Sequence, residues 1–182
     1  MILFFLALLL LIFGSFVFQL FLPPVLLLHG AAILFVPAVY FYGCVSLPFP
    51  LMLALTCFAG IFNDLLTIPQ SRSHSDFPTG ISILIYLVPG LVMHGLRPLF
   101  LRHRWETHCL LAETGAILTP FILLAQYAML SFERREIFFS HVIVWRIVGP
   151  GLISLLIAPC VFFILTPLSH VLGYRPGLPL AR

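Results

Sequence analysis

The chain has 182 residues, of which 62% are hydrophobic and only 8% are charged. A soluble domain carries about 25% charged residues, so the composition excludes an ordinary soluble domain and indicates a membrane protein. The net charge of +3 is small and the basic residues are scattered, which argues against a nucleic-acid-binding protein.

Apolar runs divide the chain into six predicted spans, since a transmembrane helix needs about 20 apolar residues. The spans are predicted at about residues 1–22, 28–47, 50–69, 79–97, 108–130 and 142–169. The first run has no basic segment before it and no small-residue cleavage site after it, so we expect a retained span rather than a signal peptide. We therefore expect a single all-α membrane domain over residues 1–182, with short loops.

The arginines predict the orientation of these spans, because cytoplasmic loops carry an excess of basic residues. The two termini and the loops after even-numbered spans would share one face, which carries Arg97, Arg102, Arg104, Arg175 and Arg182. The opposite face would carry Arg72, Arg134 and Arg135. This bias predicts that both termini lie in the cytoplasm.

Asp64 is the most informative polar residue, because a carboxylate at bilayer depth costs roughly 2.5–3.5 kcal/mol. Arg146 lies about one turn into the sixth predicted span and would enter the bilayer from the same side. One hypothesis is an ion pair between Asp64 and Arg146 that fixes the packing of the third and sixth spans. The alternatives are that Asp64 caps the adjacent loop or contacts water, or that it binds a substrate or a proton.

The remaining polar groups have simpler interpretations. Asn63 precedes Asp64, points to a different helix face, and is expected to hydrogen-bond to a neighbouring helix. Glu113 is expected either to contact Arg97 or His94 or to lie among lipid headgroups. The cysteines, Cys44, Cys57, Cys109 and Cys160, are expected to be small buried hydrophobic residues. Because no metal-ligand spacing, nucleophile–base pair or nucleotide-binding pattern is present, we expect no metal, no cofactor and no enzymatic activity.

The third and fourth predicted spans carry a pattern that resembles a known family. Residues 58–66, Phe-Ala-Gly-Ile-Phe-Asn-Asp-Leu-Leu, close one span and are followed by a polar loop, Gly80 and a new apolar span. This pattern resembles the rod shape-determining protein MreD family, which has a Gly-x-x-x-Asp-x-Leu motif at the end of its third span. The resemblance covers about residues 33–96. The family often has a Gly-rich loop after the aspartate, whereas residues 67–72 here are Thr-Ile-Pro-Gln-Ser-Arg.

The resemblance implies six transmembrane helices with a fold similar to the substrate-binding S components of ECF vitamin transporters. It also implies a non-enzymatic inner-membrane scaffold in the bacterial elongation machinery, which builds lateral peptidoglycan. The implied partners are an MreC-like bitopic protein, an MreB-like actin homologue and a glycosyltransferase–transpeptidase pair, beside membrane lipid. The candidate residues for structural or partner contacts are Gly60, Asn63, Asp64, Arg97, Glu113 and Arg146. The alternative is an S-component-like subunit that binds a vitamin-like solute for uptake.

Overall fold

The computed structural model describes residues 1–25, 30–67, 80–100, 105–134 and 140–174. This part of the chain is all-α, as predicted, and its only bridge between extended residues joins Val25 to Ala31. The helices are α1 (Ile2–Phe21), α2 (Val36–Ser46), α3 (Phe49–Thr67), α4 (Ile81–Gly95), α5 (Arg97–Phe100), α6 (Trp105–Arg134) and α7 (His141–Val171). Most of the arginines used to predict the orientation lie outside the described residues.

Within the described residues, three stretches of helix are long and apolar enough to cross a membrane: Ile2–Phe21, Phe49–Leu66 and His141–Val171. They indicate a membrane protein. The helix α4 has 15 residues and α2 has 11. At about 1.5 Å per residue, 11 residues extend only about 16 Å, or roughly half of the hydrocarbon core.

Within the second predicted span, at about residues 28–47, the helix α2 begins only at Val36. Before it, the backbone N–H of Val25 donates to the carbonyl of Ala31 at 2.9 Å, and Gly30 adopts a positive φ of 81°. Pro37 follows within the first turn of α2, where its missing N–H costs no helical hydrogen bond. The apolar composition extends further toward the N-terminus than the helix does.

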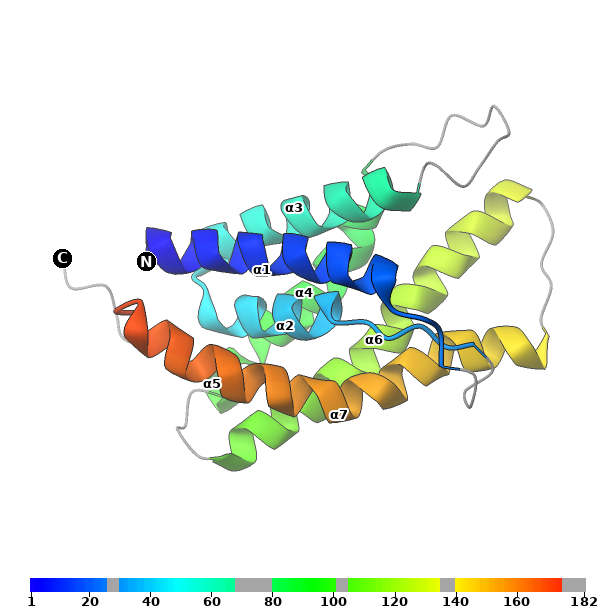
Figure 1. Ribbon diagram of the computed structural model, residues 1–182. Helices are drawn as coiled ribbons and strands as arrows, with labels where there is room; N and C mark the ends of the chain where they lie inside the picture. Colours follow the sequence, from blue (N-terminus) through cyan, green and yellow to red (C-terminus); the bar gives the residue numbers. More distant parts are fainter. Residues whose placement is uncertain (26–29, 68–79, 101–104, 135–139, 175–182) are drawn as a thin grey trace.

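The short helix α2 forms the centre of the bundle. Every residue from Val36 to Ser46 is buried, as expected for a helix with no polar face. It packs against α1, α3, α4, α6 and α7, and Figure 1 shows it enclosed by these longer helices. The longer helices are therefore arranged around a short helix.

Side chains from other helices satisfy the backbone groups at both ends of α2, which would otherwise be buried without partners. With its carboxamide oxygen turned toward α2, Gln19 of α1 accepts from the N–H groups of Phe35 (2.6 Å) and Val36 (3.0 Å). At the other end, the ring Nδ1 of His94 lies 2.9 Å from the carbonyl oxygen of Cys44. These contacts allow a helix to begin and end inside the bundle.

The outer helix α1 buries a single face. Phe4, Leu8, Ile12 and Phe16 are its buried residues, spaced four apart, so they line one side of the helix. Large apolar side chains such as Leu10 and Phe21 are exposed on its other sides. A surface this apolar fits lipid or another protein rather than water.

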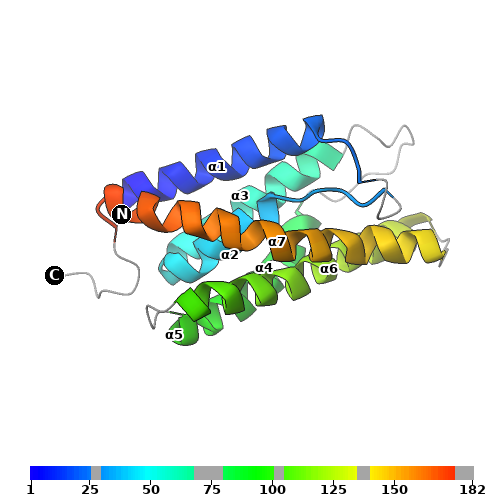
Figure 2. The same ribbon diagram turned by 60° about the horizontal axis from the view of Figure 1, so that its bottom comes forward.

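The first residues of α1 and the last of α7 meet at the same end of the bundle (Figures 1 and 2). The rings of Phe4 and Tyr174 are stacked, with centroids 4.7 Å apart and planes at 13°. The hydroxyl of Tyr174 donates to the carbonyl of Ser46 at 2.6 Å. Burial raises the pKa of the Tyr174 phenol, which keeps this group protonated as a donor.

The helices α6 and α7 pack closely where proline interrupts their hydrogen bonding. Pro120 has no N–H for the carbonyl of Ala116, which is left without its usual helical donor. That carbonyl oxygen would lie 2.8 Å from a Cβ atom at Gly151, and the ring of Pro120 would collide with the same atom. Glycine at position 151 is therefore required for the approach of the two helices.

Candidate functional site

The residues that carry the family resemblance form one surface of α3, which contacts the start of α4. A Cβ atom at Gly60 would lie 2.6 Å from both the backbone N and the Cα of Ile83. Since backbone atoms cannot rotate away, only glycine allows this separation. We refer to Gly60, Asn63 and Asp64, with Gly80, Ser82 and Ile83 opposite them, as the α3–α4 contact site.

Asn63 is the second residue of this site. Its Nδ2 donates to the hydroxyl of Ser82 at 3.0 Å. The prediction that Asn63 hydrogen-bonds to a neighbouring helix is confirmed. Asn63 and Asp64 are adjacent in α3, and both side chains bind at the start of α4, one to Ser82 and the other to Gly80.

Asp64 is the charged residue of the site and is 3% exposed. Its Oδ2 accepts a hydrogen bond of 2.7 Å from the backbone N–H of Gly80, the residue that precedes α4 with a φ of 116°. Its Oδ1 is buried and has no hydrogen-bond partner among the described residues. Of the interpretations left open by the sequence, capping of the adjacent chain is therefore the one that the geometry supports.

The hypothesis of an Asp64–Arg146 ion pair is wrong for the described structure. Arg146 is exposed, whereas Asp64 is buried and is bonded to Gly80. The helix α3 packs against α1, α2 and α4, and α7 packs against α2 and α6. Because α2 occupies the space between α3 and α7, similar depth in the membrane does not make these two side chains neighbours.

Glu113, Arg97 and His94 are not brought together either. Glu113 is exposed on α6, and its position among lipid headgroups stays a prediction. The ring of His94 instead contacts Cys44 and lies 5.7 Å, centroid to centroid, from Phe49. Arg97, at the start of α5, has a buried Nε for which the described part of the chain offers no hydrogen-bond partner.

A second set of polar contacts, not predicted from the sequence, joins α2, α3 and α4 near their middles. The hydroxyl of Tyr40 lies 2.9 Å from Thr56 Oγ1 and donates to the carbonyl of Tyr86 at 2.8 Å. Thr56 in turn donates to the carbonyl of Met52 at 2.9 Å. The only sequence signal was the presence of hydroxyl groups within apolar runs, which does not identify their partners. We call these residues the Tyr40 network.

Gly90 of α4 leaves the space that the Tyr40 hydroxyl occupies, because a Cβ atom at Gly90 would collide with that oxygen. We expect Gly90→Ala to lower the free energy of unfolding by about 1–3 kcal/mol through overpacking. Tyr40→Phe should cost about 1 kcal/mol through the lost hydrogen bond. The double variant should lose less than the sum, because removing the hydroxyl makes room for the methyl group.

Thermal or SDS unfolding of the four purified proteins in one detergent measures this coupling. A double variant whose loss equals the sum of the single losses would show that the two residues do not interact as described.

The cysteines are only partly as predicted. Cys44 is buried, but Cys57 and Cys160 are exposed on α3 and α7, and Cys109 falls where side chains are not described. Within the described residues, no group of three or more His, Cys, Asp or Glu side chains is placed to hold a metal ion. The exposed thiols lie on apolar helices, so they are useful reporters of what surrounds the bundle.

Comparisons with family models, with curated proteins and with solved structures find no match to this chain. The geometry of the α3–α4 contact site and of the Tyr40 network is therefore the basis for a functional proposal. In both places polar side chains bind to neighbouring helices and hold them together.

Proposed function

We propose that the chain is a non-enzymatic scaffold subunit of the bacterial cell-elongation machinery, resembling the MreD family. The observation that supports this proposal most directly is the way in which Gly60, Asn63 and Asp64 pack against α4. These residues hold α4 against α3 through a glycine contact and two hydrogen bonds. The pattern on which the resemblance depends thus has a packing role that suits a protein whose task is to present helix surfaces.

In this proposal the protein lies in the inner membrane with six spans and both termini in the cytoplasm. The arginine bias supports this orientation, and the common end shared by the start of α1 and the end of α7 supports an even number of crossings. The shorter helices α2 and α4 are the second and fourth spans. Burial of α2 among its neighbours allows the irregular chain before it to enter the bundle, since non-helical backbone at membrane depth needs protein around it.

The proposed partners are an MreC-like bitopic protein, an MreB-like actin homologue and a glycosyltransferase–transpeptidase pair. The outward face of α1 is available to a transmembrane helix, because its exposed side chains are apolar and, in the described structure, a Cβ atom at Gly14 would meet open space. Small residues allow close helix approach in lipid. This face is the surface that we assign to the MreC-like transmembrane segment.

Co-purification after mild detergent extraction tests the scaffold proposal. A tagged full-length chain should enrich the MreC-like protein of the same cell, and Gly14→Leu should reduce that enrichment without lowering the amount of folded chain. Gly95→Leu, at an exposed glycine of α4 whose Cβ position has open space in the described structure, is the matched control and should leave enrichment unchanged. Failure of the wild-type chain to enrich such a protein would contradict the proposal.

One observation favours the uptake alternative, in which the chain is an S-component-like subunit that binds a small solute. Among the described residues, Asp64 Oδ1 is a buried acceptor without a hydrogen-bond partner, and Gln126 Nε2 on α6 is a buried donor without one. A solute-binding subunit presents unpaired polar groups of this kind to its ligand. Co-purification of an energising ATPase pair, in place of an MreC-like protein, would favour this second function.

A further inference from the structure

The first eight residues of α7 differ from the rest of the helix in their burial. None of the side chains in 141–148 is buried, whereas from Gly149 onward a buried residue recurs in nearly every turn. The segment is therefore less covered by the bundle than the rest of the same helix. We call residues 141–148 the α7 extension.

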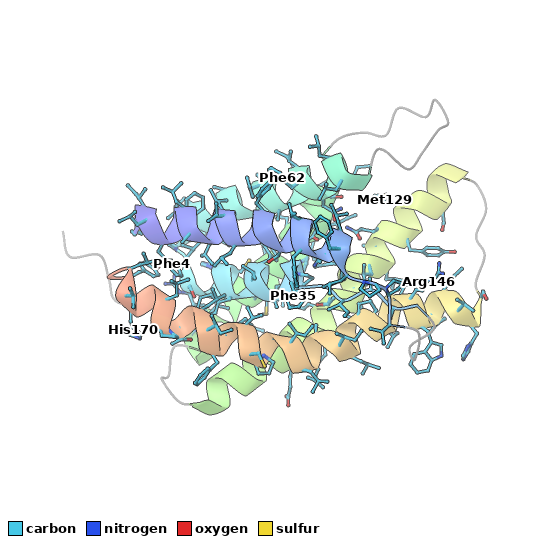
Figure 3. All side chains as sticks on the ribbon, viewed as in Figure 1. Phe4, Phe35, Phe62, Met129, Arg146 and His170 are labelled. Carbon is cyan, nitrogen blue, oxygen red and sulfur yellow. The ribbon has the colours of Figure 1, made fainter. Side chains whose placement is uncertain are left out.

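The length of α7 exceeds the thickness of the hydrocarbon core. The helix has 31 residues, or about 46 Å at 1.5 Å per residue, against a core of about 30 Å. A tilt of about 20° shortens its projection only to about 43 Å. Figures 1 and 2 show the start of α7 continuing well past the end of α1, and Arg146 lies at the end of the molecule opposite Phe4 and His170 (Figure 3).

The side chains of the extension combine aromatic, cationic and aliphatic groups. The indole N–H of Trp145 donates to His141 Nε2 at 3.2 Å, and the next residue is the exposed Arg146. The aliphatic side chains of Val142, Val144 and Val148 are 40–44% exposed. Tryptophan and arginine with apolar neighbours are typical of the boundary between hydrocarbon and lipid headgroups.

We propose that the α7 extension lies in the headgroup layer and that Arg146 binds the phosphate of an anionic phospholipid there. The charge favours this occupant, since Arg146 carries the positive charge of the extension and its side chain is exposed. Its guanidinium matches a phosphate with two parallel donors. The valines would contact the upper acyl chain. This surface is independent of the partners proposed above.

Quenching of tryptophan fluorescence by brominated lipids tests the proposal at the site itself. In full-length protein carrying Trp105→Phe, Trp145 is the remaining tryptophan. Reconstituted into mixtures of plain and brominated lipid, its fluorescence should show brominated phosphatidylglycerol binding about fivefold more strongly than brominated phosphatidylcholine, as expected for one basic residue.

Arg146→Gln in the same background should reduce this preference to near unity, and Arg146→Lys should retain most of it. Equal quenching by the two lipids in the parent protein would overturn the proposal, as would a preference that survives Arg146→Gln. Absence of quenching by either lipid would overturn it as well, because Trp145 would then lie in water or under protein.

Discussion

Replacing Gly60 with leucine is expected to abolish most of the folded protein. A Cβ atom at this position would lie 2.6 Å from the backbone N and Cα of Ile83, so even alanine forces α3 and α4 apart. Overpacking a core costs about 1–3 kcal/mol and more where backbone must move. Separation of the two helices would also break the Asn63–Ser82 and Asp64–Gly80 hydrogen bonds. We therefore expect a loss of more than about 3 kcal/mol.

Gly14→Leu is the matched control, since Gly14 lies in the interior of the apolar helix α1 with no atoms around its Cβ position. The variant should be as stable as the wild type or more stable, because glycine is about 1 kcal/mol less favourable than alanine within a helix. Size-exclusion chromatography detected by fluorescence measures the folded fraction of both. A Gly60→Leu protein that elutes and melts like Gly14→Leu would show that α3 and α4 do not approach as described.

Removal of the Asp64 side chain, by Asp64→Ala, is expected to lower the free energy of unfolding by about 1.5–3 kcal/mol, the usual contribution of a hydrogen bond to a charged group. Asp64→Asn should cost less, because an amide oxygen still accepts from the N–H of Gly80 and the buried charge is removed. Unfolding in SDS compares the two. An asparagine variant as unstable as the alanine variant would mean that the charge, rather than the bond to Gly80, stabilises the fold.

The same series tests the pairing of Asp64 with Arg146. Since α2 lies between α3 and α7, the losses caused by Asp64→Ala and Arg146→Ala should add within about 0.5 kcal/mol. The positive control is the pair Asn63→Ala and Ser82→Ala, which share a hydrogen bond of 3.0 Å and should not be additive. Losses that are not additive for Asp64→Ala and Arg146→Ala would show that these two residues do form an ion pair.

The sequence was informative where a polar or small residue interrupts an apolar run. The helical class follows from composition, and the importance of Gly60, Asn63 and Asp64 follows from their position at the end of a span. Their partners could not be predicted in the same way. The residues that they contact belong to the next helix. Which residues of two helices meet is set by the packing of the helices and not by the periodicity of either one.

The central helix could not be predicted, because hydropathy does not distinguish helix from apolar extended chain. The run from residue 28 to 47 reads as one span, yet the helix begins only at Val36. Gln19, which accepts hydrogen bonds from the N–H groups at the start of α2, lies in another helix. Nothing in the sequence indicates this role of its side-chain amide. The predicted ion pair between Asp64 and Arg146 is wrong for a related reason. Equal depth fixes the positions of two residues along the bilayer normal but not within the plane of the membrane.

We expect the exposed apolar faces of this bundle to contact lipid, while its polar groups hydrogen-bond to neighbouring helices inside the bundle. Cys57 and Cys160 lie on two such faces, and they can be examined in protein whose other two cysteines are alanine. In intact liposomes a charged, water-soluble maleimide should leave both thiols unmodified until SDS is added. An engineered thiol at the exposed Ser140, which precedes α7, should react at once. Rapid modification of Cys57 or Cys160 in intact liposomes would contradict the account.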